Sequence, residues 1–302
     1  MIDITHKTHT LRVATAQAVV SVSRAETIAA IQTKTVPKGD VFAMSRAAGL
    51  LGVKRTAVML PDCHPIPIEY TGIEYEVKGL EIRISCTVKT IYKTGVEVEA
   101  MHGASVVALN IYDMLKPIDK GIEIRRVKLV RKQGGKSAFA NRQKDIRAAV
   151  VVCSDTISAG KKEDKAGKAV VEKLRESGVT IADYIIIPDE KDRIQAKAKQ
   201  YRRQGVDLIV YTGGTGLSER DVTPEALRPL LRRDIPGIAE AIRSYGQNRT
   251  PYSMLSRSIA GVLDKTLVLA LPGSTGGARD SMEAIFPSVL HIFKVLKGMR
   301  HD

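Results

Sequence analysis

The second half of this sequence switches repeatedly between short apolar runs and amphipathic helical segments. The run AAVVVCS has the length and content of a buried strand, and ADYIIIP, DLIVYTG and TLVLALPG are predicted to be further strands. Helical patterns separate them: one ends at Gly178, a basic one covers 191–204, and others follow at TPEALRPLL, at 236–246 and at 278–297, where Pro287 can bend the helix. Strands that alternate with helices form a parallel sheet covered on both faces, so we expect a doubly wound α/β sandwich of three layers.

Polar or glycine-rich signatures follow the ends of these runs: SDT (154–156), PDE (188–190), GGTG (213–216) and PGSTGG (272–277). Ligands bind a doubly wound sheet where its strands end, so the four loops point to one edge. Glycines let backbone amides approach an anion, and hydroxyl groups add donors. A lone GGTG is more often only a tight turn, but the second glycine loop favours anion binding. The residues expected to bind substrate here are Asp155, Gly213, Gly214, Thr215, Gly216 and Ser274.

Three aspartates, Asp155, Asp189 and Asp221, accompany the glycines. Carboxylates that face bound phosphates repel them unless a hard cation lies between. We therefore predict Mg²⁺ held by Asp189 and Asp221 together with phosphate oxygens. Each aspartate alone is more often a cap or turn residue, so the prediction rests on all three. Thr223 is expected to be the N-cap of the next helix, whose free amides would add to the anion site.

The first half has a different pattern. Residues 72–95, GIEYEVKGLEIRISCTVKTIYKTG, alternate in the way typical of antiparallel strands, and helical patterns cover 12–31, 43–51 and 97–116. We expect an α+β domain of ferredoxin-like type, an antiparallel sheet with helices on one face. A length of 302 residues fits two domains, and the basic, glycine-bearing stretch 129–147 separates the two patterns. The expected division is a first domain at 1–138, a linker at 139–146 and a second domain at 147–302.

Polar side chains of the first half gather in three stretches. KGDVF places Lys38 in a glycine turn, and LPDCHP holds His64 between prolines. On a helix from residue 97, the residues Glu99, His102, Asn110 and Asp113 share one stripe, with Lys116 one turn beyond Asp113. A solvated face is the ordinary reading of such a stripe. Because this helix is rich in small and apolar residues, however, its ionisable groups should be paired or functional, and acid/base chemistry on an anionic substrate is the hypothesis.

Charge and composition limit the partners. The net charge of +14 is spread over the chain: 22 basic and 14 acidic residues up to residue 146, and 25 and 19 beyond. Aromatic residues make up only 4%, so a dispersed excess favours anionic small molecules over nucleic acid. No apolar run approaches the length of a membrane span and no signal peptide is evident, so we expect a cytoplasmic protein without membrane contact. Cys63, Cys86 and Cys153 have no metal-binding or disulfide spacing.

Residues 147–298 resemble the molybdopterin adenylyltransferase family, which includes MogA, MoaB and the gephyrin G domain. SDT, PDE, GGTGLSERDVTPEA and PGSTGG carry the resemblance, in order and spacing. It implies transfer of AMP from Mg-ATP to molybdopterin, with Asp189 and Asp221 as the functional aspartates and Asp155 in a ligand loop. The stretch SRSIAGVLDKTLVLALPGST is similar to the MoaB branch, some of whose members lack the activity.

The first half, from MIDIT through GGKS, resembles the cyclic pyranopterin monophosphate synthase family, MoaC. KGDVF, LPDCHP, KTGVEVEA and IYDMLK carry this resemblance, although residues that usually precede the start are missing. It implies conversion of 3′,8-cyclo-7,8-dihydro-GTP into cyclic pyranopterin monophosphate and pyrophosphate, without a tightly bound cofactor. Members are oligomers with sites shared between subunits. The residues carried over are Lys38, Asp113 and Lys116 as the acid/base centre, and His64, Glu97 and Glu99 as substrate-binding groups.

Two hypotheses follow. The first is a bifunctional, homo-oligomeric enzyme of molybdenum cofactor biosynthesis with two active halves. The first half would use the cyclic dihydro-GTP intermediate, and the second half would use molybdopterin and Mg-ATP. Other enzymes of the pathway would be its partners. The second keeps the synthase and makes the second half a catalytically silent pterin-binding or oligomerising module. Magnesium-dependent AMP transfer discriminates between them.

Overall fold

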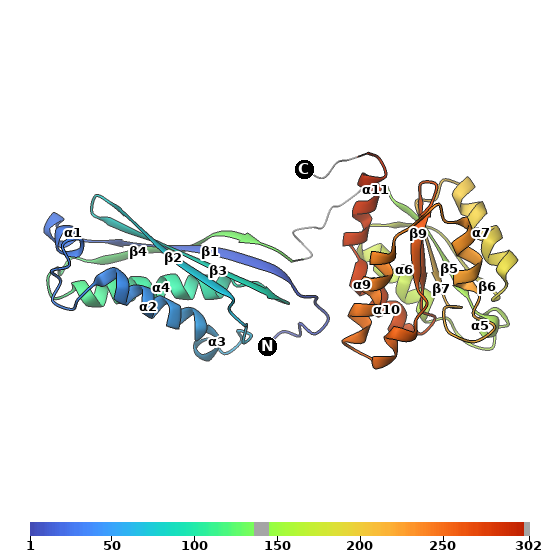
Figure 1. The fold of residues 1–302 in the computed structure, drawn as a ribbon, viewed down its shortest axis with the longest axis horizontal. Helices are drawn as coiled ribbons and strands as arrows, with labels where there is room; N and C mark the ends of the chain where they lie inside the picture. The colour runs from blue at the N-terminus through green and yellow to red at the C-terminus, as the bar shows by residue number, and fades with distance from the viewer. Residues whose placement is uncertain (136–144, 299–302) are drawn as a thin grey trace. The chain divides into compact units, whose positions relative to one another are not determined.

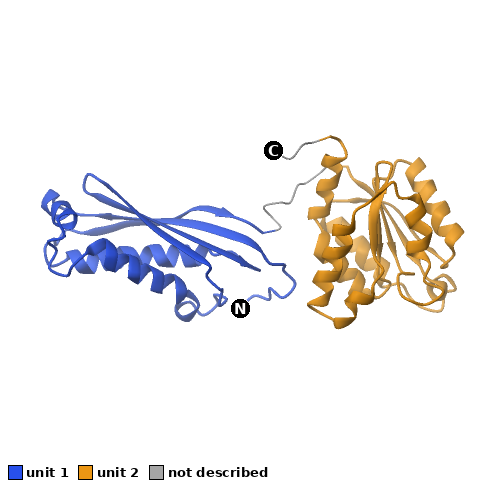
Figure 2. Ribbon diagram, in the orientation of Figure 1, with its two compact units in different colours: residues 1–139 blue, residues 140–302 orange. Residues whose placement is uncertain are grey.

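The computed structural model describes residues 1–135 and 145–298. The chain divides into two compact units, Met1–Phe139 and Ala140–Asp302 (Figure 2). Of the linker expected at 139–146, residues 139–144 lie outside the described part of the chain. Among the helices of the described residues, none combines the length and the apolar character needed to cross a membrane.

Unit 1 is an antiparallel four-stranded sheet with helices on one face (Figure 1). The strand order is β2-β3-β1-β4, and every neighbouring pair is antiparallel. This confirms the predicted antiparallel sheet with helices. The elements are β1 (Thr10–Ser21), α1 (Ala25–Gln32), α2 (Val41–Lys54), α3 (Thr56–Met59), β2 (Tyr70–Lys78), β3 (Glu81–Tyr92), α4 (Glu97–Leu115) and β4 (Glu123–Gln133).

The helix predicted at 12–31 is wrong over its first half, which is strand β1; only its end, from Ala25, is helical, in α1. Ala14, Ala16 and Ala18 are fully buried and alternate with half-buried residues, which is the period of a strand. Alanine favours helices in isolation, but here its small side chain lets helix α4 pack closely on the sheet. Strand β4 was also missed, and the boundary stretch 129–147 begins inside it.

Unit 2 is an α/β unit with a six-stranded sheet in the order β6-β5-β7-β10-β9-β8 (Figure 1). Its strands are β5 (Arg147–Cys153), β6 (Thr180–Ile187), β7 (Leu208–Thr212), β8 (Arg233–Asp234), β9 (Ile259–Leu263) and β10 (Thr266–Leu271). Its longer helices are α6 (Ala166–Glu176), α7 (Lys191–Arg203), α9 (Pro236–Gln247) and α10 (Thr275–Ile285). Short helices are α5 (Asp155–Ser158), α8 (Thr223–Leu227), η2 (Arg228–Leu230), η3 (Pro251–Leu255), η4 (Ser288–His291) and α11 (Ile292–Val295).

The sheet of unit 2 is mixed rather than parallel. Strands β6, β5, β7 and β10 are parallel, whereas β9 pairs antiparallel with β10 and with β8. The run IAGVLDKTLVLAL is a hairpin that turns at Asp264, whose φ is 57°. The single helix predicted at 278–297 ends at Ile285 and is followed by two short turns around Pro287.

Helices cover both faces of this sheet, as expected. Alternate residues of β5 enter two separate apolar clusters: Val150 packs in the cluster with α6 and α10, and Val151 in the cluster with α7 and α8. A sheet sealed on both faces leaves its strand ends as the place where polar loops can meet a ligand.

Candidate functional sites

A cluster of two lysines and one aspartate lies at the C-terminal end of α4. Asp113 accepts hydrogen bonds from Lys38 Nζ at its Oδ2 atom and from Lys116 Nζ at its Oδ1 atom, each at 2.7 Å. Lys116 and then Lys38 lower the pKa of Asp113 to about 2. The hydrogen bond to Asp113 in turn raises the pKa of Lys116. At neutral pH the cluster therefore holds an ionised aspartate and a protonated Lys116 that faces solvent.

Local structure explains why these residues meet. Lys38 precedes Gly39, whose φ of 96° turns the chain, and Asp40 caps α2 by accepting a hydrogen bond from the Ala43 amide at 3.0 Å. Asp113 and Lys116 lie one helical turn apart, and Lys116 is the C-cap of α4. The structure thus brings together the three residues expected to form the acid/base centre.

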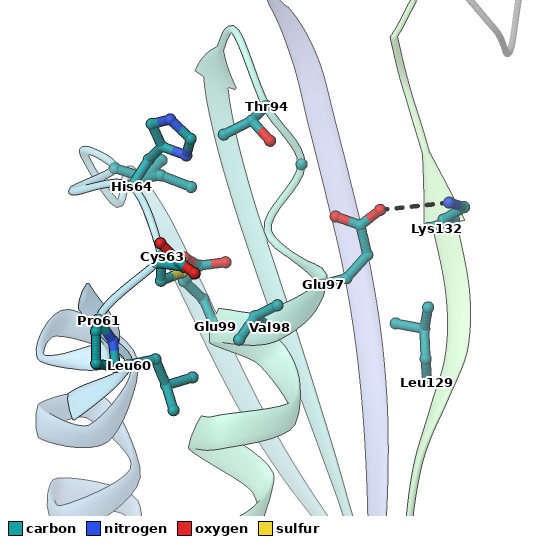
Figure 3. Close-up of a pocket in the computed structure, with 13 residues that line it drawn as sticks. Leu60, Pro61, Cys63, His64, Thr94, Glu97, Val98, Glu99, Leu129 and Lys132 are labelled. Carbon is teal, nitrogen blue, oxygen red and sulfur yellow. Dashed lines mark hydrogen bonds and ion pairs between the residues drawn. The ribbon is translucent and has the colours of Figure 1, made fainter. Parts of the chain in front are cut away.

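His64, Glu97 and Glu99 line a different cavity of about 800 Å³ at the other end of α4 (Figure 3). The loop around His64, the first turn of α4 and Lys132 of β4 form its walls. His64 Nε2 lies 2.8 Å from the Ile2 carbonyl oxygen, and Lys132 Nζ lies 3.5 Å from Glu97 Oε1. The three predicted substrate-binding groups therefore share one cavity.

The cluster and the cavity are not brought together within one chain. Glu99 and Asp113 lie on one helix, and at 1.5 Å per residue their backbones are roughly 21 Å apart along its axis. Glu99 is only 3% exposed, whereas the Asp113 side chain is 48% exposed. The predicted stripe is therefore not one continuous surface: its first end lines the cavity, and its second end belongs to the lysine cluster.

Sequence reasoning missed two basic residues near this cavity. Lys132 stands on β4, the end of which, from residue 129, was assigned to the domain boundary. Arg12 stands on β1, which was assigned to a helix; its guanidinium donates to the carbonyls of Tyr92 and Lys93 at 3.2 and 3.0 Å. Together with Glu97, both line an adjoining cavity of about 310 Å³. The period-two alternation of β1 was the signal that could have placed Arg12.

In unit 2 the predicted glycine turn is built around close backbone approaches. Gly213 has a φ of 104°, and a Cβ atom there would lie 2.0 Å from the Cys153 carbonyl oxygen. At Gly214, with φ of 62°, a Cβ would lie 2.3 Å from Thr223 Oγ1 and 2.7 Å from Asp189 Oδ1. Only glycine fits both positions, so the turn holds the β7 loop directly against the β5 and β6 loops.

The three aspartates gather around this turn. The Asp189 amide donates to Asp155 Oδ1 at 3.0 Å, and the Asp155 amide donates to Asp189 Oδ2 at 3.3 Å. Asp221 Oδ2 accepts from the amide and hydroxyl of Ser218 at 2.9 and 2.6 Å. A Cβ on Gly216 would lie 2.9 Å from Asp221 Oδ2. Folding thus collects the carboxylates from three separate strand ends.

The carboxylates differ in their electrostatics. Burial raises the pKa of Asp189, and the charges of Asp155 and Asp221 add to that effect. Arg220 forms an ion pair with Asp155 at 2.7 Å and lowers the pKa of that carboxyl. Burial opposes ionisation of Asp221, but the Ser218 hydrogen bonds lower its pKa. Asp189 is therefore the carboxylate that most lacks a compensating positive charge.

Asp189 Oδ1 is buried and has no hydrogen-bond partner among the described residues. Within residues 1–135 and 145–298, no group of three or more His, Cys, Asp or Glu side chains is arranged to hold a metal on its own. The unpartnered Asp189 oxygen is the kind of ligand that a cation would take if it is held by one or two carboxylates and phosphate oxygens, the usual arrangement for Mg²⁺.

The remaining predicted residues lie beside this turn, with one correction. Gly273, next to Ser274, packs on Gly213; the exposed Ser274 caps α10 by accepting from the Gly277 amide at 3.2 Å. Thr215 is buried. Thr223, however, is not an N-cap: it is the first residue of α8, its side chain is fully buried, and Val222 precedes it without a capping bond. The five-residue α8 lacks the predicted capped start.

Arg257 is a residue of this site that sequence reasoning missed. Its amide donates to the Thr215 carbonyl at 3.1 Å, and its guanidinium donates to the Gly216 carbonyl at 2.6 Å and to Glu225. It therefore fixes both the start and the end of the 213–225 loop. It lies in the stretch SRSIAGVLDKTLVLALPGST, two residues before strand β9, but that stretch served only to indicate the MoaB branch, so Arg257 was given no role.

Replacing Gly213 with alanine is expected to destabilise unit 2 by roughly 2–4 kcal/mol, because the side chain meets a backbone carbonyl in addition to a strained φ. Gly178→Ala is the matched control: its φ is 78°, but a Cβ there would meet nothing within 4 Å, so about 1 kcal/mol is expected. Urea unfolding, followed by hydrogen exchange in peptides of unit 2, measures both variants. Equal losses would show that the close approach at Gly213 does not exist.

Each unit matches a known protein family. The family described as "MoaC family" matches residues 1–135, and that described as "Probable molybdopterin binding domain" matches residues 149–291. The "Molybdenum cofactor biosynthesis bifunctional protein" of Chlorobaculum tepidum is 40% identical over 301 residues, which cover 100% of this chain and 96% of that protein.

Two further relatives cover single units. The "Cyclic pyranopterin monophosphate synthase" of Clostridium perfringens is 43% identical over 143 residues, 47% of this chain and 90% of that protein. The crystal structure of the molybdopterin biosynthesis enzyme MoaB from Thermus thermophilus has 40% sequence identity and a TM-score of 0.49, and the match covers 52% of this chain and 100% of that one.

Proposed function

Because this chain belongs to the family of bifunctional molybdenum cofactor biosynthesis proteins, we propose a separate reaction for each of its units. Unit 1 converts 3′,8-cyclo-7,8-dihydro-GTP into cyclic pyranopterin monophosphate and pyrophosphate. Unit 2 transfers AMP from Mg-ATP to molybdopterin. The strand order β2-β3-β1-β4 supports the ferredoxin-like topology proposed for unit 1.

The observation that carries the proposal for unit 1 is the bridging of two lysines by Asp113. Formation of the cyclic phosphate requires a sugar hydroxyl to lose its proton to water and its oxygen to bond to the α-phosphorus, while the bond from that phosphorus to pyrophosphate breaks. The protonated Lys116 can donate its proton to the departing oxygen, and the charge of Lys38 can offset the negative charge that develops there. Asp113 keeps both ammonium groups in place and raises the pKa of Lys116.

A complete unit 1 site requires the cavity of one copy to meet the lysine cluster of another. Within a single chain these groups stand at opposite ends of α4, too far apart to act on one substrate. A two-fold related pair with antiparallel α4 helices would place each cluster beside the partner's cavity. We therefore propose that the synthase sites are shared between subunits, with His64, Glu97 and Glu99 holding the substrate.

Mixing two inactive variants tests this sharing. Lys116→Ala loses the cluster and His64→Ala alters the cavity, so each homo-oligomer should be nearly inactive. In a co-refolded mixture, one site of each mixed pair combines two intact halves, and about a quarter of the wild-type rate should return. Pyrophosphate release measures it. If mixing restores no activity although mass spectrometry shows mixed oligomers, the site lies within one chain.

The observation that carries the proposal for unit 2 is the unpartnered buried oxygen of Asp189 beside two more aspartates and a glycine turn. Asp189 and Asp221 would hold Mg²⁺, which when bound neutralises charge on the ATP phosphates. The exposed backbone at Gly216 and the hydroxyl of Ser274 face the same edge and can bind phosphate oxygens. Asp155, paired with Arg220, orients the Asp189 backbone.

A further inference from the structure

The contact between Cys63 and Glu99 is unusual for a substrate cavity. Glu99 is 97% buried, and its Oε1 atom accepts a hydrogen bond from the Cys63 thiol at 3.4 Å. Its second oxygen, Oε2, has no partner in the part of the chain that the structure describes. In Figure 3 the Cys63 sulfur lies beside the Glu99 carboxylate, and His64 is the next residue of the same loop. The protein thus binds Glu99 Oε1, and Oε2 is available to accept a hydrogen bond from a ligand.

We propose that Cys63 is a positioning residue for the synthase reaction: its thiol fixes Glu99 so that the free oxygen accepts an N–H or O–H group of the substrate. This inference rests on the proposed function of unit 1. A buried carboxylate oxygen without a donor is costly unless a ligand supplies one. The substrate is a guanine derivative with several N–H donors, so it can meet that requirement.

A thiol suits this role better than a stronger donor. Burial, together with the charge of Glu99, raises the pKa of Cys63 to about 11, so the thiol stays protonated and can donate at neutral pH. It is a weak donor, so it orients Glu99 without strongly acidifying it. Burial keeps the pKa of Glu99 raised, with Glu97 adding to it and His102 opposing it. The other titratable side chains that line the cavity are Asp62, His64 and Lys132.

The contact between Cys63 and Glu99 can be tested without an activity assay, by alkylation of the thiol. Cys86 and Cys153 are almost fully buried, so iodoacetamide should modify the native full-length chain at Cys63. Glu99→Gln removes the neighbouring charge, and the alkylation rate of Cys63 at pH 8 should rise by about threefold or more. Glu97→Gln is the matched control, because Glu97 does not contact the thiol, and its rate should stay that of the wild type. An unchanged rate in Glu99→Gln would overturn the inference.

The positioning role is tested by turnover. Cys63→Ala should lower kcat/KM for the cyclised dihydro-GTP by about tenfold at an unchanged melting temperature, and Cys63→Ser should recover part of the loss. The hydrogen bond from the Cys63 thiol lowers the pKa of Glu99. Its loss in Cys63→Ala should therefore raise that pKa, and the acid limb of the profile of kcat/KM against pH should move to higher pH. Cys86→Ala, a core cysteine without a carboxylate partner, should leave the profile unchanged.

The outcomes separate the two proposals. Wild-type kcat/KM and an unshifted acid limb in Cys63→Ala would overturn the role of Cys63 and leave the synthase function standing. A wild-type chain that releases no pyrophosphate would defeat the synthase function, and the positioning role would fall with it.

Discussion

Replacing Lys116 with alanine is expected to lower the rate of pyrophosphate release by unit 1 by about a thousandfold or more. Lys116 is the protonated group that Asp113 holds at 2.7 Å and presents to solvent, and it is the proton donor of the proposed reaction. Its side chain is half exposed and supports no core, so the melting temperature should not change. Steady-state assays with the cyclised dihydro-GTP substrate measure the loss.

Lys120→Ala is the matched control, because Lys120 is exposed on the same segment and should tolerate the change. Asp113→Asn tests the electrostatic argument separately. Without the carboxylate, the pKa of Lys116 should fall, and the alkaline limb of the pH–rate profile should move to lower pH. A Lys116→Ala variant with the wild-type rate would remove the cluster from the mechanism.

The elements that sequence predicted well are those with a strong local pattern. The strands β5, β7 and β10 contain continuous apolar runs, β6 ends in one, and α4 has a clear helical period. Strand β1 was mistaken for a helix because its inward residues are alanines, whose local preference opposes the structure that packing selects. The antiparallel direction of β9 depends on its partners, and an apolar run carries no information about direction.

In the candidate sites, too, some features could be predicted from the sequence and others could not. The carboxylates of unit 2 could be grouped from sequence because each follows a strand, and strand ends converge by topology. The sequence pattern of α4 showed that Glu99 and Asp113 lie on the same side of the helix. It did not show that they are separated along the axis of this 19-residue helix and so belong to two different places. Arg257 and Lys132 act through contacts between distant segments, which no local motif records.

Replacing Asp189 with asparagine is expected to abolish magnesium-dependent AMP transfer by unit 2, with a loss of about a thousandfold or more. The same change should leave unit 2 as stable as before, or more stable. Burial and the charges of Asp155 and Asp221 raise the pKa of Asp189, so its ionised form opposes folding at neutral pH. A neutral amide of the same shape relieves that repulsion.

Magnesium provides a second readout of the same residue. If Asp189 and Asp221 hold the ion, Mg²⁺ with ATP should raise the melting temperature of the wild-type unit 2 and have a much smaller effect on Asp189→Asn. Glu219→Gln is the control, since Glu219 is exposed in the same loop between Ser218 and Arg220.

The two measurements also decide between an active and a silent unit 2. In a silent pterin-binding module, Asp189→Asn would bind molybdopterin unchanged, and neither the wild type nor the variant would form AMP-pterin. An adenylyltransferase retains Asp189 at a cost in stability because the ion requires it. AMP transfer by the wild type, lost in Asp189→Asn and Asp221→Asn but kept in Glu219→Gln, would establish the enzyme; equal transfer by all four proteins would remove the aspartates from the reaction.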